Sequence, residues 1–401
     1  MKSNRVKRPA SSGAAFDRGE LVSRLNAAGH TPEFAGSICQ VPRKHYVDPD
    51  YFAAETTVLF RKYPTYVGHS AEISAAGDYK TLKIAGVPLL IVRGGDGVAR
   101  GFRNTCRHRG APVMTTANGN CGNGGGKMIC HYHGWTYDTR GALVGVPLPA
   151  AFPNLDRKAN GLGPIRVQEK YGLIFAIIDD DAPDFDLVDH LGDLGPQFDS
   201  IGLAGFKPAL HESIVAPTNW KLAWETFGES YHVPALHPRL LAIIPGSGLA
   251  YDSFGPHGRI TLPLAGLPEL LAQPKSRWAA AESGVHILFH YLLFPNIVVT
   301  LMDGAAQIQN IAPGRHVGEA VTTQTQVFAP TLSEEKKNTY GGFFNFSLHD
   351  LTANEDYPMA AGIYESLVAG SLQHTTLGRA EWPLHLFHQQ RQRLMAAAGF
   401  A

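Results

Sequence analysis

A chain of 401 residues can hold two or three domains, and 44% hydrophobic with 17% charged residues is the composition of a globular protein. Lysine plus arginine and aspartate plus glutamate number 35 each, so we expect neither a nucleic acid nor a membrane surface as partner. No apolar run is long enough to cross a membrane, no signal peptide follows the basic N-terminus, and four cysteines make no disulfide framework, which together favour a cytoplasmic protein.

The N-terminal part is predicted to be helical and the next part to consist of strands. Helices are expected at 20–28 and at 51–60, the latter after the turn signal Asp48-Pro49-Asp50. Short apolar or alternating runs then predict strands, and Gly95-Asp96-Gly97 is typical of a hairpin turn. The strands are expected at 81–84, 89–92 and 98–102.

Two pairs of candidate metal ligands follow this hairpin. Cys106-x-His108 and Cys130-x-x-His133 lie on two loops separated by a glycine-rich segment. Thiolates of Cys106 and Cys130 on one iron, with imidazoles of His108 and His133 on the other, form the ligand set of a Rieske [2Fe–2S] cluster. A structural zinc site with two cysteines and two histidines is the alternative. We favour the cluster, because zinc does not require the His-Arg-Gly and His-Gly-Trp sequences found here.

A second metal motif lies about a hundred residues later. The segment 218–232 contains good helix formers and no proline, so we predict a helix on which Glu225, Glu229 and His232 share one face. Pro234 should end or kink this helix and turn His237 back towards His232. Two histidines and a carboxylate leave positions on Fe(II) open for dioxygen and substrate. The alternative is a polar helix face with ordinary surface histidines.

The C-terminal half is predicted to combine antiparallel strands with helices, an α+β arrangement. A strand is also expected at the aromatic residues 343–348, followed by a helix that Asn354 caps and that runs to Val368. Asp350, Glu355 and Asp356 are the candidates for the iron carboxylate. Neighbouring helical residues point about 100° apart, so at most one of the last two should face the iron. Both acids could instead only complement a helix dipole. Further strands are expected at 285–301, 307–311 and 321–328.

The motifs at 102–110, 130–135 and 219–237 resemble, in order, the signatures of the catalytic α subunit of Rieske non-haem iron ring-hydroxylating oxygenases. The resemblance implies a small all-β Rieske domain and a helix-grip catalytic domain, in which a sheet with helices encloses a cavity. It favours Asp356 as the third ligand of the mononuclear iron. The expected division is an N-terminal arm with helices at 1–54, the Rieske domain at 55–165 and the catalytic domain at 166–401.

The sequence departs from the family pattern in three places. His131 stands where proline is common, the loop between His108 and Cys130 is longer than usual, and Glu229 stands where many members have aspartate. Glutamate at this bridging position resembles a subset of the family that includes oxygenases of quaternary ammonium compounds.

The resemblance also implies the reaction and the partners. It implies a terminal oxygenase component that hydroxylates an aromatic compound or aromatic acid with O2, by mono- or dioxygenation, in aromatic compound catabolism. Electrons should come from a separate NAD(P)H-dependent reductase, with or without a ferredoxin, since no dinucleotide fingerprint or plant-type ferredoxin spacing occurs. A homotrimer is expected, with or without a β subunit, in which Glu229 links His133 of one subunit to an iron-binding histidine of the next.

Two alternatives remain from the sequence. One is a monooxygenase or demethylase of a quaternary ammonium compound, since aromatic cages suit such cations. The other is an electron carrier with the Rieske cluster alone, against which the additional motif at Glu229, His232, His237 and Asp356 argues.

Overall fold

The computed structural model describes residues 17–28, 37–122, 126–245 and 248–400. Residues 1–16 and 29–36 of the expected N-terminal arm lie outside these ranges. The helices expected near 20 and 51 are present as α1 (Arg18–Ala28) and α3 (Pro49–Phe60), with the short α2 (Lys44–Val47) before the latter. The Asp48 side chain accepts hydrogen bonds from the backbone amides of Asp50 and Tyr51, so it caps α3 at Pro49.

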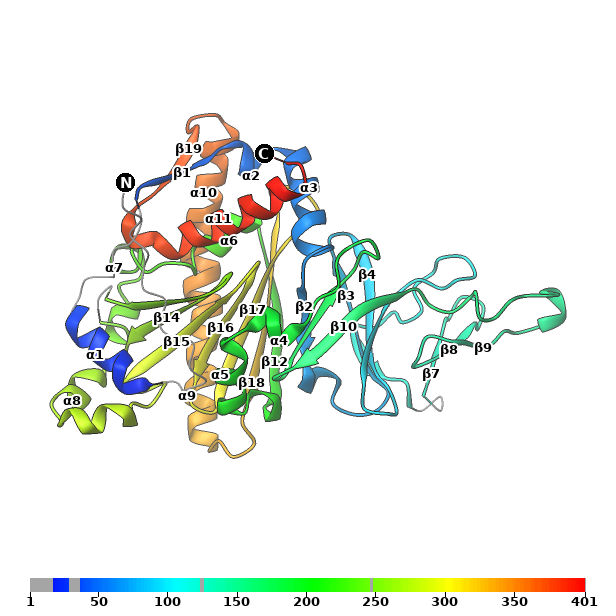
Figure 1. The fold of residues 1–401 in the computed structure, drawn as a ribbon, viewed down its shortest axis with the longest axis horizontal. Coiled ribbons are helices and arrows are strands. Elements are labelled where there is room, and N and C mark those ends of the chain that lie inside the picture. The colour runs from blue at the N-terminus through cyan, green and yellow to red at the C-terminus, as the bar shows by residue number, and fades with distance from the viewer. Residues whose placement is uncertain (1–16, 29–36, 123–125, 246–247, 401) are drawn as a thin grey trace.

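The Rieske part consists of a seven-stranded antiparallel sheet with a three-stranded sheet beyond it (Figure 1). The large sheet has the order β2-β11-β10-β5-β4-β3-β6. Its strands are β2 (Thr65–His69), β3 (Asp78–Ile84), β4 (Val87–Arg93), β5 (Ala99–Arg103), β6 (Asn118–Asn120), β10 (Pro164–Lys170) and β11 (Leu173–Ile177). The small sheet contains β7 (Lys127–Ile129), β8 (Thr136–Asp138) and β9 (Leu143–Gly145). Because β10 and β11 belong to the large sheet, it continues past the expected boundary at 165, and we propose a boundary after Ile178 instead.

The catalytic part is built on a second seven-stranded antiparallel sheet with the order β12-β18-β17-β16-β15-β14-β13. The strands are β12 (Lys207–Ala216), β13 (Ala250–Phe254), β14 (His257–Pro263), β15 (Ile287–Leu293), β16 (Ile297–Met302), β17 (Ala305–Pro313) and β18 (Ala320–Phe328). Register places Ile260, His290, Thr300 and Gln307 side by side on neighbouring strands, so they share one face. The short helices around this sheet are α4 (Leu187–Leu191), α5 (Leu194–Ile201) and α8 (Leu267–Leu271).

A long helical rod crosses the catalytic sheet (Figure 1). It consists of α9 (Glu334–Asn345), a π-helical segment (Phe346–Asp356) and α10 (Tyr357–Val368). The strand expected at 343–348 is therefore wrong, and Asn354 lies within the rod instead of capping a new helix. Phe344, Leu348 and Leu351 are buried at spacings of four and three residues, the pattern of a helix face. The prediction failed because the phenylalanines also fit the composition of a strand.

Two segments far apart in the sequence pair on the catalytic part. β1 (Cys39–Pro42) pairs with β19 (His374–Leu377), and α11 (Trp382–Ala397) follows. The Rieske part is built from antiparallel strands, and the catalytic part combines helices with an antiparallel sheet. This arrangement confirms the predicted α+β class. Among the described residues, none of the helices combines the length and apolarity needed to span a bilayer.

A buried ionic cluster joins three helices from distant parts of the chain. The Glu55 carboxylate on α3 contacts Lys221 Nζ at 2.5 Å on α6 (Trp220–Glu225) and Arg391 Nη1 at 3.1 Å on α11. The three side chains are fully buried, and Trp220 Nε1 also donates to Glu55 at 3.0 Å. One carboxylate thus compensates two buried cations at the start of the segment that carries Glu229 and the histidines.

We expect Glu55→Gln to lower the free energy of unfolding by about 3–5 kcal/mol, because it leaves Lys221 and Arg391 without their counter-charge. Asp181→Asn is the matched control. It removes the exposed Lys62–Asp181 pair and should cost less than about 1 kcal/mol. Urea unfolding followed by circular dichroism measures both. Equal costs for the two substitutions would contradict the role given to Glu55.

Candidate metal centres

The two cysteine–histidine loops have the same backbone shape. In one, the amide of Gly110 donates to Cys106 O at 2.9 Å, and in the other the amide of Gly134 donates to Cys130 O at 2.9 Å. Both glycines have positive φ angles of 79° and 70°. Such backbone favours glycine, which explains the glycine in His-Arg-Gly and in His-Gly-Trp.

The four predicted cluster ligands lie on these loops. Cys106 and Cys130 are buried, and the rings of His108 and His133 are 4.5 Å apart between centroids. Nδ1 of His108 is buried and has no hydrogen-bond partner among the described residues, as expected of a nitrogen that binds iron. Burial raises the pKa of the Cys130 thiol, so metal binding must release its proton.

A single zinc ion fits these loops less well than a cluster. Ligands of zinc, at about 2.0–2.3 Å from the ion, lie within about 4 Å of one another. In the described part of the chain, one group of three or more metal-binding side chains has all its donor atoms within 4.8 Å of one another. That group is His232, His237 and Asp356, and it does not include the cysteines and histidines of these loops. Donor atoms spread over a wider space suit two irons. The Cys106 sulfur also lies 3.3 Å from the Tyr137 hydroxyl, a contact of the kind that tunes Rieske potentials.

The predicted continuous helix to His232 is wrong. α6 ends at Glu225, and after irregular turns a second short helix, α7 (Val233–Leu236), begins. A Cβ atom on Gly228 would lie 2.2 Å from Leu384 Cδ2, so the backbone here packs directly against α11. The Glu229 side chain then bonds the backbone amides of Tyr231 and His232, which a helix would have used itself.

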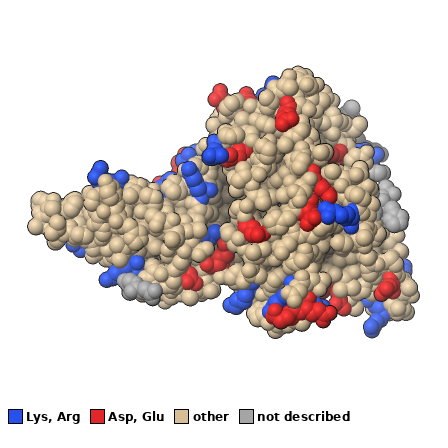
Figure 2. All heavy atoms as spheres, turned by 180° about the vertical axis from the view of Figure 1, so that it is seen from behind, with Lys and Arg blue, Asp and Glu red and all other residues tan. Residues whose placement is uncertain are grey.

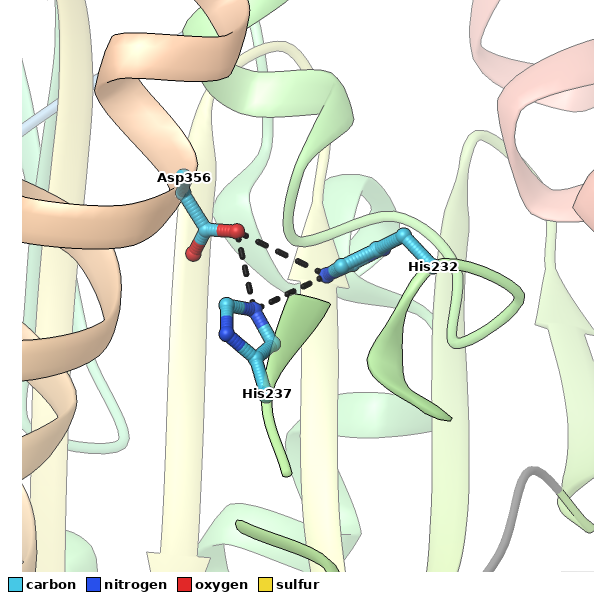
Figure 3. A group of neighbouring side chains, drawn as sticks. All are labelled: His232, His237 and Asp356. Atoms are coloured by element: carbon cyan, nitrogen blue, oxygen red, sulfur yellow. Dashed lines mark hydrogen bonds and ion pairs between the residues drawn. The ribbon is translucent and has the colours of Figure 1, made fainter. Parts of the chain in front are cut away.

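His232, His237 and Asp356 nevertheless converge (Figure 3). Nε2 of His237 lies 3.2 Å from Nε2 of His232 and 3.0 Å from Oδ1 of Asp356, and the remaining separation is 3.5 Å. Ligands about 2.1 Å from a metal and at right angles to one another lie about 3 Å apart. The three atoms therefore fit one face of a mononuclear iron, with positions opposite left for other ligands.

A carboxylate holds the outer nitrogen of each histidine. Glu229 Oε1 bonds His232 Nδ1, and Glu355 Oε2 lies 2.6 Å from His237 Nδ1. A proton on Nδ1 leaves the Nε2 lone pair free for metal. Burial favours neutral rings, but the facing carboxylates outweigh it and raise the pKa of both histidines. Protons should therefore compete with metal at low pH.

The role of Glu355 was missed by sequence reasoning. Glu355 and Asp356 do point in different directions, but the ring of His237 lies between them and presents one nitrogen to each. Arg239 holds the other oxygen of Glu355 at 3.0 Å and also binds Asp350 at 2.9 Å. Asp350 is thus in an exposed ion pair away from the three converging ligands. The only sign of this role in the sequence is that Glu355 is an acid directly before the predicted ligand Asp356.

Two cavities meet at this site. The sheet cavity, about 100 Å³, is lined by His232, His237 and Asp356 and by mostly apolar side chains from β14, β15 and the rod. The β19 cavity, about 470 Å³, lies between α6, α10 and β19. Glu229, His232 and Asp356 line both.

Comparison with known proteins decides the family. Residues 64–156 match the model of the Rieske [2Fe-2S] domain, and residues 203–397 match the ring hydroxylating alpha subunit (catalytic domain). The chain belongs to the Rieske ring-hydroxylating oxygenase α subunits. The matched domains are those that carry a Rieske [2Fe–2S] cluster and a mononuclear iron, as the two predicted ligand sets require.

Curated relatives of this Rieske chain include both monooxygenases and dioxygenases. The oxygenase subunit of glycine betaine monooxygenase from Chromohalobacter salexigens is 36% identical over 203 residues, 50% of this chain and 44% of that protein. Chlorobenzene dioxygenase subunit alpha from Cupriavidus sp. (strain PS12) is 38% identical over 274 residues, 65% and 57% of the two chains. The chain spans about half the length of the curated relatives it matches.

Two solved structures share the fold over nearly the whole length. A quaternary ammonium Rieske monooxygenase superposes with a TM-score of 0.75 at 16% identity, covering 98% of this chain and 99% of its own. Naphthalene 1,2-dioxygenase from Rhodococcus sp. superposes with a TM-score of 0.72 at 21% identity, covering 95% and 98%. These likenesses concern the fold.

We expect Asp356→Ala to lower the mononuclear iron content while the visible absorption of the Rieske cluster is retained, because one of three ligands is lost. Glu355→Gln should keep the ligands but weaken iron binding about 10–100-fold, since the proton on His237 Nδ1 is no longer held by a charged acceptor. Asp350→Asn serves as the control and should bind iron normally. Titration of metal-free protein with Fe(II) measures all three. An empty site in the control, with iron retained in Asp356→Ala, would reject the ligand assignment.

Proposed function

We propose that this chain is the terminal oxygenase component of a multicomponent system, which uses O2 and electrons from a separate NAD(P)H-dependent reductase to hydroxylate an aromatic compound. The observation that carries the proposal is the convergence of His232, His237 and Asp356 at the wall of an apolar cavity. An electron carrier needs neither that ligand set nor that cavity. For monooxygenation the balance is RH + O2 + 2e⁻ + 2H⁺ → ROH + H2O; dioxygenation adds both oxygen atoms and also consumes two protons.

The residues of this chain divide the work in the proposed reaction. Bound iron would supply the activation of dioxygen. His232, His237 and Asp356, which all line the sheet cavity, would hold it. Glu229 and Glu355 keep the ring nitrogens oriented. The apolar wall, with Ile260, Leu262, Leu288 and Leu351, excludes water and holds an apolar substrate beside the metal.

The lining of the sheet cavity favours an uncharged aromatic compound over an aromatic acid. No lysine or arginine occurs among the described residues that line it, so an anionic substituent would be buried without a counter-charge. His290 in the wall cannot serve, because burial lowers its pKa to about 4 and keeps it neutral. An apolar cavity of roughly 150 Å³ binds benzene, so about 100 Å³ suits a single ring after small side-chain movements.

A quaternary ammonium compound is the second candidate. Three observations favour it: the glutamate at position 229, the glycine betaine monooxygenase relatives, and two phenylalanines in the cavity wall, Phe227 and Phe343. Against it, the acids nearest the cavity, Glu229 and Asp356, are already bonded to histidines. A betaine would also bring a carboxylate for which the described lining offers no cation.

Oxygen uptake with a surrogate reductase separates these classes. We expect substrate-dependent uptake and a hydroxylated product with an uncharged single-ring compound such as toluene, and neither with benzoate or glycine betaine. Phe343→Ala enlarges the sheet cavity, so it should raise turnover of a two-ring substrate relative to toluene. Uptake with glycine betaine alone would instead establish the second candidate.

We propose that the chain assembles head to tail as a trimer, with or without a β subunit, and that a reductase, directly or through a ferredoxin, supplies the electrons. Figure 1 shows the sheet of β7, β8 and β9, which carries the Cys130 loop, at the opposite end of the molecule from α7. Tyr132 and Leu148 are exposed at this end, and its outer tip is largely uncharged on the face in Figure 2. Met359 and Ile363 are exposed beside the β19 cavity. Apolar surfaces at both ends suit contact between copies.

In such a trimer the cluster of one subunit would serve the iron of the next, with Glu229 between His133 of the first and His232 of the second. Glu229 already bonds His232 Nδ1 and lines the β19 cavity, where a neighbouring subunit would dock. A charged acceptor shared by the two histidines would fix both rings.

Co-expression of two inactive variants tests electron transfer between subunits. Cys130→Ala should abolish the Rieske absorption and Asp356→Ala the mononuclear iron, each alone giving an inactive enzyme. In trimers formed at random, about a quarter of wild-type activity should return, because half of the chains keep the iron and half of their donors keep the cluster. The separately purified variants, mixed without reassembly, are the control. Complete inactivity of correctly mixed trimers would indicate transfer within one chain.

A further inference from the structure

Glu225 at the end of α6 has a role that the metal sites do not explain. Sequence periodicity places it on one helix face with Glu229, but the helix ends at Glu225, and its side chain lies between α2 and α11 instead. The Tyr46 hydroxyl donates to Glu225 Oε1 at 2.8 Å, and His388 Nε2 lies 3.0 Å from the same oxygen. The carboxyl also lines the β19 cavity, together with His232 and Asp356.

The contacts of His388 define its protonation. Its Nδ1 lies 3.3 Å from Arg391 Nη2, and a guanidinium can only donate, so Nδ1 is an acceptor. The proton of the neutral ring is therefore on Nε2, which donates to Glu225. Burial lowers the pKa of His388 well below its usual value, which keeps the ring neutral. Two neutral donors thus hold one oxygen of an acid whose side chain is 11% exposed.

The ionic cluster behind Glu225 cannot conduct protons from solvent to it, because the side chains of Glu55, Lys221 and Arg391 are fully buried and Arg391 does not release a proton. Protons must reach the carboxyl through the β19 cavity, which has room for ordered water. The same cavity extends to Glu229, His232 and Asp356. Glu225 therefore shares a solvent space with the iron site while being anchored on its other side.

The charges around Glu225 act in opposite directions. Burial favours the neutral acid, whereas Tyr46, Lys221 and Arg391 favour the carboxylate, and burial dominates, so its pKa is raised to about 7. A carboxyl that titrates near neutral pH can both give and regain a proton. The titratable or charged groups that face it from the packed elements or across the β19 cavity are Tyr46 on α2, Glu55 on α3, Lys221 on α6, Glu229 and His232 after α6, Asp356 in the rod, Glu381 before α11, and His388 and Arg391 on α11.

We propose that Glu225 is the residue that donates protons to the iron site across the water of the β19 cavity. The inference rests on the proposed oxygenase function, in which each turnover consumes two electrons and two protons. Glu225 gives a proton to cavity water next to the site, becomes a carboxylate, and is reprotonated from solvent through water that the cavity retains when a neighbouring subunit docks over it. Glu381 lines the same cavity, but its Oε2 accepts the backbone amide of Gly378 at 2.6 Å, so it has a structural partner.

Glu225→Gln tests the proposal, with the exposed Glu335→Gln on α9 as control for the substitution. We expect Glu225→Gln to lower kcat about 100-fold or more, with KM, iron content and cluster reduction unchanged. The kcat of the wild type and of the control should fall as the pH rises through about 7, because the protonated acid is the active form. This alkaline limb of the pH profile should be absent in Glu225→Gln. A wild-type kcat with an unchanged pH profile in that variant would overturn the proposal.

Tyr46→Phe is the second variant and leaves the acid in place. It removes a donor that favours the carboxylate, so the alkaline limb of kcat should move to higher pH. A merely structural role of Glu225 would leave that limb where it is, and this result would also overturn the proposal.

Thermal unfolding distinguishes failure of this inference from failure of the proposed function. The pKa of Glu225 is raised above its unfolded value of about 4.5, so the folded state retains a proton in this window and stability falls as the pH rises from about 5 to 7. Glu225→Gln should not show this loss of stability. The Tm of the variant relative to that of the wild type should therefore increase as the pH rises. A constant difference overturns the titration of Glu225, whatever substrate the enzyme takes.

Discussion

The site depends on a carboxylate that never touches it. Glu55 compensates Lys221 and Arg391 in a region with no access to water, and these cations belong to the helix before the iron ligands and to the C-terminal helix. Buried ion pairs are weak sources of stability, but an unpaired member is costly, so the cluster permits only arrangements that keep all three groups together. It therefore places α6 against α3 and α11. The turns that carry His232 and His237 follow α6 directly, so their starting point is set by the position of this helix.

The iron site repeats this principle at smaller scale. Each ring nitrogen that faces the metal is directed by an acid on the far side of the same ring, Glu229 for His232 and Glu355 for His237. Glu355 is itself held by Arg239. Because the ligands are oriented before metal binds, little reorganisation is required of them. The apolar sheet cavity can then be specialised for a substrate without disturbing the ligands.

Sequence patterns predicted the site better than the path of the chain to it. Cys106, His108, Cys130 and His133 could be proposed as ligands from the sequence because ligand spacing is short and depends on loops that glycines specify locally. His232, His237 and Asp356 were brought together by an argument that required a long helix, and that helix does not exist. Gly228 and the packing of Leu384 against it interrupt α6, and no local pattern contains a contact with residue 384. Glu355 was missed for a similar reason, since its partner is 118 residues away.

The two acids on either side of this interruption have separate tasks because their surroundings differ. Glu229 accepts hydrogen bonds from two backbone amides and bonds a histidine. Glu225 is buried between neutral donors, where the charged form is disfavoured and its pKa is raised to about 7. In a continuous helix both carboxyls would have lain on one face in similar surroundings. The break at Gly228 turns them into different environments around one cavity, so that one holds a histidine while the other can exchange protons.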